Sequence, residues 1–280
     1  MKSNFIFQTD HPLVVKEYEN KNYKIIFDNS VKTGTCAIYF SSNNIYYPNN
    51  ELEFKKTIID NDNYEWYKTR IKNIHKHIYL RDIHKQWYLT GINSNIDTPE
   101  KLLDFLLFET KNCKVTLVGS SAGGYAAVLY GSLLSAEKIF SFNGQMELNS
   151  LLKSSSSDLD PLIFKLQNTS ARQFYDLNNF IPDISKTSNI FYFTSVKSKW
   201  DAEQASHISQ KAIRKLRFNT NHHGIPFLKC SLFNVINFSS EKLSSFTKSI
   251  NNPIIFSIRC SGIIKVTNYL FKLIYRKFTN

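Results

Sequence analysis

The segment KVTLVGSSAGGYAAVLYGSLL, residues 114–134, decides the fold. It places an apolar β-type run immediately before Gly-x-Ser-x-Gly, residues 119–123, and a run rich in small residues immediately after it. In this context the serine stands at a sharp turn between a strand and a helix, and glycines are needed where side chains would collide with neighbouring backbone. The pattern predicts that Ser121 is a covalent nucleophile and that Ser120 points away into the packing.

Short β-type runs alternate with helical patterns on both sides of this segment, which is typical of crossover units and a mostly parallel sheet. The expected strands are residues 22–27, 35–40, 114–119, 138–143, 189–194 and 216–219, and the expected helices are 99–111, 123–134 and 202–216. Together with the serine turn, this order predicts the α/β-hydrolase fold, a mostly parallel central sheet flanked by helices. A phosphate-binding loop is disfavoured, because the P-loop lysine and the GxGxxG spacing are both missing.

The domain organisation follows from where this alternation stops. Residues 145–188 contain a serine cluster, two prolines and an aromatic stretch, and we predict a cap inserted over the site. The alternative is a pair of surface helices that protect the sheet edge. The catalytic domain is expected to span residues 1–245, and residues 246–280 are expected to form a basic amphipathic tail.

In this fold an acid and a histidine follow the nucleophile along the chain, each near the end of a later strand. Asp201 is expected in the loop before a helix and is the predicted triad acid; its alternative role is an N-cap. Asp176 and Asp183 are less suitable as the acid, because they precede the strand at 189–194. His207 falls inside that expected helix. His222 and His223 follow the next strand, and we predict His223 as the base. His222 is the alternative base and otherwise a structural or substrate-facing residue.

Backbone N–H groups are expected to stabilise the oxyanion of an acyl transfer reaction. The N–H of Ala122 is one predicted donor, because it follows the nucleophile. The second should come from the loop after strand 35–40, which makes Ser41 or Ser42 the candidate donor.

A second early segment, IYLRDIHKQWYLTG at residues 78–91, gathers charged and aromatic side chains. Aromatic faces stack on pyranose rings while charged groups bind hydroxyls, so Arg81, Trp87 and Tyr88 are predicted to bind a sugar. The alternative is a salt-bridged strand end with aromatic residues in the core.

Charge and cysteine usage limit the partners and the compartment. The chain carries 35 Lys and Arg against 23 Asp and Glu, a net charge of +12, which suits an anionic partner or reflects genome composition. The four cysteines lie far apart without metal-ligand spacing, so no metal is expected. The start of the chain lacks a signal-peptide pattern and no long apolar run occurs, which predicts a cytoplasmic protein, soluble or peripheral at the inner membrane.

The basic tail has no acidic residue after Glu241. The helix expected at residues 263–278 carries basic residues on one face and apolar residues on another: Lys265, Lys272 and Arg276, and Ile263, Val266, Leu270 and Leu273. Such a helix predicts contact with an anionic membrane surface. The alternative is a helix packed on the domain. Nucleic acid is not expected, because no recognition motif accompanies the charge.

Three motifs together, GSSAGGYAA at 119–127, RDxxxQWYxxG at 81–91 and HHGIPF at 222–227, carry a resemblance. They resemble α/β-hydrolase-like proteins of bacterial capsule and surface-polysaccharide clusters, among them serine-dependent capsule O-acetyltransferases and accessory secretion acyltransferases with a Ser-Asp-His triad. Over residues 20–240, the resemblance implies Ser121 as nucleophile, Asp201 as acid and His223 as base.

The function expected from these observations is acyl transfer, most simply O-acetylation of a surface polysaccharide. Acetyl-CoA is the expected acyl donor, and no bound cofactor is expected. An esterase with the same triad and a non-catalytic polysaccharide-assembly protein that retains the fold are the alternatives.

Overall fold

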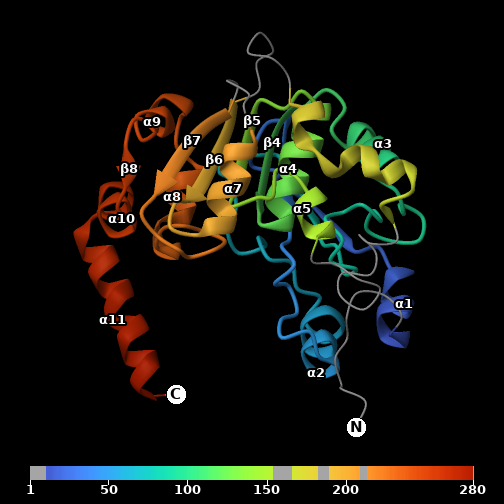
Figure 1. Cartoon of the computed structure of the whole chain (residues 1–280), viewed down its shortest axis with the longest axis horizontal. Helices are drawn as coiled ribbons and strands as arrows, with labels where there is room; N and C mark the ends of the chain where they lie inside the picture. The colour runs from blue at the N-terminus through green and yellow to red at the C-terminus, as the bar shows by residue number, and fades with distance from the viewer. Residues whose placement is uncertain (1–10, 154–165, 182–188, 209–212, 280) are drawn as a thin grey trace.

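The structure is a computed structural model that describes residues 11–153, 166–181, 189–208 and 213–279. All strands of these residues belong to one central sheet. Its order is β1-β3-β2-β4-β5-β6-β7-β8 (Figure 1). Only β1 runs antiparallel to its neighbour. The strands are β1 Tyr23–Phe27, β2 Thr35–Phe40, β3 Lys76–Leu80, β4 Lys114–Ser120, β5 Lys138–Phe142, β6 Asn189–Ser195, β7 Ile213–Phe218 and β8 Ile250–Asn251.

The helices surround this sheet. The α-helices are α1 Pro12–Tyr18, α2 Glu51–Phe54, α3 Pro99–Glu109, α4 Ala122–Leu133, α5 Asn149–Leu152, α7 Lys199–His207, α8 Leu232–Ile236, α9 Ser240–Ser244, α10 Pro253–Ser261 and α11 Ile263–Thr279. A π-helix, η1 Lys55–Asp60, continues α2, and short 3-10 turns are η2 Ser170–Tyr175, η3 Leu177–Asn179 and η4 Lys229–Ser231.

Two apolar clusters cover the two faces of the sheet, because successive side chains of a strand point to opposite sides. Ile38 of β2 belongs to the cluster with α3 and α4, whereas its neighbour Tyr39 belongs to the cluster with α8, α9 and α10. This explains why the strands read as continuous apolar runs, as expected for a parallel sheet buried on both faces.

The turn between β4 and α4 has the strained geometry that its sequence predicts. Ser121 has a φ of 53°, in the left-handed region that L-residues rarely adopt. A side chain at Gly119 would place its Cβ 1.9 Å from the carbonyl oxygen of Gly123, and one at Gly123 would lie 2.3 Å from that of Phe40. Both glycines are therefore required for the close approach of α4 to the sheet, and the α/β-hydrolase fold is confirmed.

Several elements differ from their prediction. The strand β3 was not predicted, because KHIYL begins with two polar residues. The helix expected over 202–216 ends at His207, and residues 213–218 form β7 instead. Asp201 consequently lies in the first turn of α7, whose N-cap is Ser198, and not in the loop before the helix.

The region expected to be a cap is described only at residues 145–153 and 166–181. There, Phe174, Tyr175 and Leu177 pack in the same apolar cluster as α4, so this part covers a face of the sheet. The remaining residues of the expected cap, 154–165 and 182–188, lie outside the described part of the chain.

The folded domain extends beyond the boundary that the sequence predicted at residue 245. The strand β8 pairs with β7, and Phe256 of α10 is buried in the core, so the domain extends through α10. α11, which follows α10, projects from the domain (Figure 1).

Candidate active site

Three loops at the carboxyl edge of the parallel strands converge on Ser121. The serine follows β4, Asp201 lies in the first turn of the helix after β6, and His223 follows β7. Carboxyl ends of parallel strands meet at one edge of an open α/β sheet, which is where ligands bind in such folds. The three side chains, far apart in sequence, are thus brought together by the topology.

A single histidine connects the hydroxyl and the carboxylate. Nε2 of His223 lies 2.9 Å from Oγ of Ser121, and Nδ1 lies 2.8 Å from Oδ1 of Asp201. This is the hydrogen-bond chain that activates a nucleophilic serine, with the base between nucleophile and acid. The second histidine, His222, makes neither contact; instead, its backbone carbonyl accepts hydrogen bonds from Ser195 Oγ and Asn143.

The carboxylate of Asp201 is buried away from solvent. Asp201 is 2% exposed, and its backbone N–H donates to the Ser198 side chain at the start of α7. Its second oxygen, Oδ2, is buried without a hydrogen-bond donor among the described residues. With little else to share its charge, the carboxylate interacts mainly with His223.

The loop that carries His223 is fixed by Asn143, the residue directly after β5. Nδ2 of Asn143 donates to Ser195 Oγ at 2.8 Å and to the carbonyl of Gly224 at 2.9 Å, and Oδ1 accepts the Ser195 N–H. The ring of Trp200 lies parallel to that of His223, with an interplanar angle of 3° and centroids 6.0 Å apart. Asn143 and Trp200 therefore position the histidine from two sides.

A side-chain amide also reaches the nucleophile. Nε2 of Gln145 lies 3.4 Å from Oγ of Ser121, and its Oε1 accepts a hydrogen bond of 2.8 Å from the indole of Trp87. The backbone that carries Gln145 is tied to α7 by Gln204, which accepts the N–H groups of Met146 and Glu147. Gln145 thus presents a fixed N–H donor beside Ser121.

The predicted oxyanion donors have different surroundings. The N–H of Ala122 has no acceptor among the described residues, so it is available to a ligand. The N–H of Ser41 donates to the carbonyl of Leu80 within the sheet. The N–H of Ser42 donates to the Glu65 carboxylate at 2.6 Å. The prediction for Ser41 is therefore wrong, and Ser42 is available only when Glu65 moves away.

Ser121 and His223 border a pocket of about 290 Å³. The residues that line it are Ser42, Asn44, Glu65, Ser120, Ser121, His222, His223, Gly224, Ile225 and Lys229. Ser120 is among them, although it is only 5% exposed, as its predicted place in the packing requires. Burial and the charges of Lys229 and His223 lower the pKa of His222, which favours its neutral form in the pocket.

The predicted sugar platform does not form. The guanidinium of Arg81 is buried and bonds Asn22 and Asp62, and the hydroxyl of Tyr88 donates to the Ser41 carbonyl. Both residues stabilise the strand end, as the alternative interpretation holds. Trp87 is also buried, and its indole orients Gln145.

The carboxylate of Glu65 is expected to slow the acylation of Ser121. Glu65 is exposed as a whole residue, but it borders the pocket. Desolvation there raises the pKa of its carboxyl, while the hydrogen bonds from Ser42 and the charge of Lys229 oppose this shift. Ionised, the carboxylate occupies the Ser42 N–H and repels a developing oxyanion. We expect Glu65→Gln to accelerate acylation of Ser121 about tenfold at pH 7, as for a like charge several ångströms away.

Rapid-mixing kinetics with an activated ester measures this acylation rate. The advantage of the variant should shrink as the pH falls through the raised pKa, because protonation also removes the charge in the wild-type protein. Glu203→Gln, which removes an exposed carboxylate of α7, is the control and should change nothing. A slower Glu65→Gln variant would show instead that the carboxylate assists the reaction.

Sequence reasoning missed Asn143, Gln145, Trp200 and Glu65. Asn143 and Gln145 lie within the three residues after β5, at the edge that carries Ser121, and Trp200 precedes Asp201, so position was a usable signal for these three. Glu65 comes from the irregular segment before β3, where no pattern indicates a pocket.

Among the described residues, no group of three His, Cys, Asp or Glu side chains is arranged to hold a metal ion.

The strand order and the serine turn define a protein of the α/β-hydrolase fold. No family model and no curated protein sequence matches the chain. Among solved structures, it is similar to the capsule O-acetyltransferase of Neisseria meningitidis serogroup A, with 16% identity over 72% of this chain and 82% of that chain and a TM-score of 0.46. A variant of that enzyme in complex with CoA has 15% identity, coverage of 67% and 77%, and a TM-score of 0.41.

A protein of unknown function from Staphylococcus aureus subsp. aureus Mu50 is also similar, with 14% identity over 80% of this chain and 94% of that chain and a TM-score of 0.46. All these TM-scores lie below 0.5, so the fold assignment depends on the strand order and the serine turn of this chain itself.

Proposed function

We propose that this protein is a serine-dependent acyltransferase that moves an acetyl group to a hydroxyl of a bacterial surface polysaccharide. The observation that carries the proposal is the position of His223, in hydrogen-bond contact with both Ser121 and Asp201. A histidine in this place serves as general base and then as general acid, which the two halves of an acyl transfer require.

In the first half, Oγ of Ser121 attacks the acyl carbonyl carbon while Nε2 of His223 takes the hydroxyl proton. Asp201 stabilises the resulting imidazolium through Nδ1. The oxyanion accepts hydrogen bonds from the Ala122 N–H and from Gln145. The tetrahedral intermediate then collapses, the bond to the leaving group breaks, and the leaving group receives the proton from His223.

In the second half, an acceptor hydroxyl attacks the acyl-serine and gives its proton to His223. Collapse of the second intermediate breaks the bond to Oγ, and the proton returns to Ser121. A glycan hydroxyl as acceptor gives an O-acyl sugar, whereas water gives a free acid. The same side chains serve both outcomes, so the acceptor decides the class of enzyme.

The choice of acetyl donor and glycan acceptor is supported by the motifs of the sequence. The names of the similar structures agree with it, since one is a capsule O-acetyltransferase and a variant of it is described in complex with CoA. Acetyl-CoA is therefore the proposed donor, used as a co-substrate.

The test is incubation of the purified protein with acetyl-labelled acetyl-CoA and a panel of de-O-acetylated capsular polysaccharides. We expect label to enter at least one polysaccharide as an alkali-labile ester. Release of labelled acetate at a rate that no polysaccharide changes would contradict the transferase and identify an esterase. An absence of any labelled product would exclude acetyl-CoA as the donor.

Hydrolysis is the second candidate, and one observation favours it. The side chain of His223 is 41% exposed, so water reaches the base in the structure as described. A transferase needs the acceptor, or a closing segment, to displace that water.

The place of the protein in the cell stays a prediction. Among the described helices, none has the length and apolar character needed to cross a bilayer. The cytoplasmic location is proposed from the sequence.

A further inference from the structure

The helix α11 carries an apolar face that nothing in the described structure covers. Its members are Ile263, Ile264, Phe271, Ile274 and Phe278, which recur at helical spacing and lie within about 100° of one another around the axis. Their exposed fractions range from 53% to 84%. A soluble helix normally buries such a face against its own domain.

The helix is attached to the domain by a different side. Val266, 1% exposed, is its one buried side chain among those described, and Leu270 is half-buried. These two belong to the face that the sequence suggested as the apolar contact face. The domain therefore uses them as an anchor, and the larger, aromatic face points into solvent.

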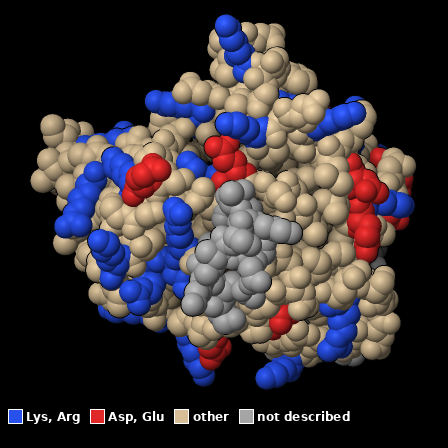
Figure 2. Space-filling view, turned by 90° about the horizontal axis from the view of Figure 1, so that it is seen from above, with Lys and Arg blue, Asp and Glu red and all other residues tan. Residues whose placement is uncertain are grey.

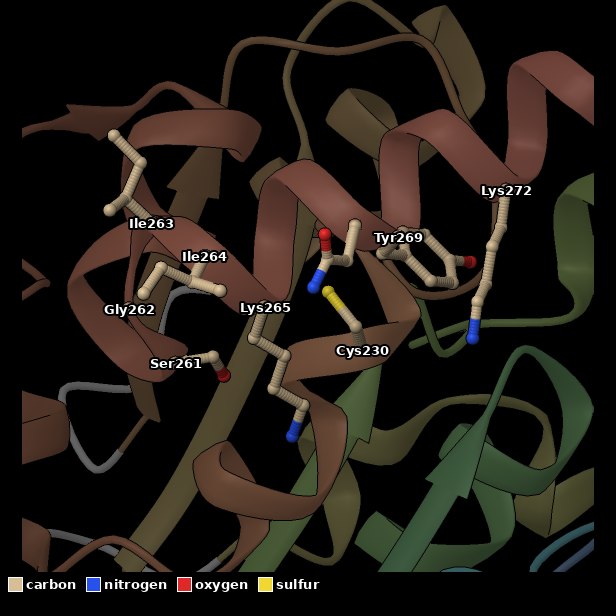
Figure 3. A pocket seen from close by; sticks show the side chains of 9 residues that line it. Cys230, Ser261, Gly262, Ile263, Ile264, Lys265, Tyr269 and Lys272 are labelled. Carbon is tan, nitrogen blue, oxygen red and sulfur yellow. The ribbon is translucent and has the colours of Figure 1, made fainter.

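A basic flank lies beside the exposed apolar face. Lys265 and Lys272 are two turns apart and extend in the same direction, along a cavity of about 760 Å³ that is also lined by Asn268, Tyr269 and Cys230 (Figure 3). Arg276 continues this flank toward the end of the helix. Amphipathic helices that lie in a membrane interface combine an apolar face with basic residues of this kind.

The rest of the molecule agrees with this arrangement. Lys and Arg side chains gather on the side of the molecule that carries β7, α9 and α10 (Figure 2). α11 leaves the molecule from this side but extends toward the opposite end, beyond the carboxyl ends of the strands, where Ser121 lies (Figure 1). The net charge of +12 attracts a negatively charged surface to the molecule as a whole.

We propose that α11 docks the protein on the surface of a lipid bilayer that contains acidic headgroups. The exposed apolar face enters the boundary between headgroups and acyl chains, while Lys265, Lys272 and Arg276 contact the acidic headgroups. Because the helix and the nucleophile lie on the same side of the sheet, docking brings the site toward that surface. This inference is independent of the proposed chemistry.

A second copy of the chain would be a less suitable occupant. Pairing two such helices face to face would bring two basic flanks together, and the tail has no acidic residue after Glu241 to neutralise them. Acidic lipids supply the missing negative charge. Phe271, Tyr275 and Phe278 also suit an interface, where aromatic rings are favoured.

The test is co-sedimentation of the full chain with vesicles made of equal parts phosphatidylglycerol and phosphatidylcholine, or of phosphatidylcholine alone. We expect binding to the acidic vesicles that high salt weakens. Lys265→Gln with Lys272→Gln should weaken it about 30-fold, the effect of two cations at an anionic surface. Phe271→Glu with Phe278→Glu should weaken it at least about tenfold, because it removes apolar burial.

The matched control is Phe108→Glu, which introduces the same change at a phenylalanine of α3 that is 77% exposed. It should bind as the wild-type protein does. Equal binding to both kinds of vesicle, or unchanged binding by both α11 variants, would overturn the proposal. Sedimentation velocity without lipid tests whether a second copy of the chain binds α11 instead. A dimer that only the variant at Phe271 and Phe278 dissociates, together with an absence of vesicle binding, would assign α11 to a second copy.

Discussion

Ser121→Ala is expected to abolish covalent labelling by a fluorophosphonate probe and to reduce acyl transfer by at least about 10⁴-fold. The alanine removes the atom that must form the acyl bond, while the Ala122 N–H and Gln145 remain. What survives is the small acceleration that oxyanion stabilisation and binding alone provide. Labelling detected by mass spectrometry, together with the rate of acetyl release, measures both effects.

The control for this variant is Ser120→Ala, one residue earlier in the same motif. Ser120 borders the pocket, but no hydrogen bond links its hydroxyl to His223 among the described residues. Ser120→Ala should therefore label normally and retain most activity. Labelling of folded Ser121→Ala would end the nucleophile assignment, and a failure of the folded wild-type protein to label would favour the non-catalytic alternative.

Local sequence was enough to predict the elements that strong physical constraints define. The turn at Ser121 was predictable because two glycines there admit no side chain, and the long apolar strands because both faces of a parallel sheet are buried. The chain order of nucleophile, acid and histidine then left few candidates, and the structure brings Ser121, Asp201 and His223 together.

Features set by distant contacts were not predictable in this way. Arg81 and Tyr88 looked like ligand-binding residues, yet their partners come from Asn22, Asp62 and Ser41, which no local pattern connects to them. The same holds for Glu65, whose carboxylate reaches the Ser42 N–H across 23 positions of the sequence. The exposed face of α11 was misjudged because periodicity shows that a helix has an apolar side, but not which side its domain covers.

Asp201→Asn is the second variant with a large expected effect, a decrease in activity of about 10⁴-fold with the fold retained. The carboxylate accepts a hydrogen bond from Nδ1–H of His223, which leaves Nε2 unprotonated and free to accept the proton of Ser121. An asparagine can turn its NH₂ group toward Nδ1 and so favour the tautomer that carries its proton on Nε2. In that tautomer the histidine cannot act as a base, although every side chain keeps its place.

The chain offers an internal control, because Asp176 makes a second carboxylate–histidine contact, 2.9 Å from Nε2 of His207. Neither of these residues borders the pocket. Asp176→Asn should therefore change stability slightly and activity hardly at all, as thermal unfolding and the acetyl release assay would measure. If Asp201→Asn keeps activity within about tenfold of wild type, Asp201 is an N-terminal residue of α7 without a catalytic role, and another group must orient His223.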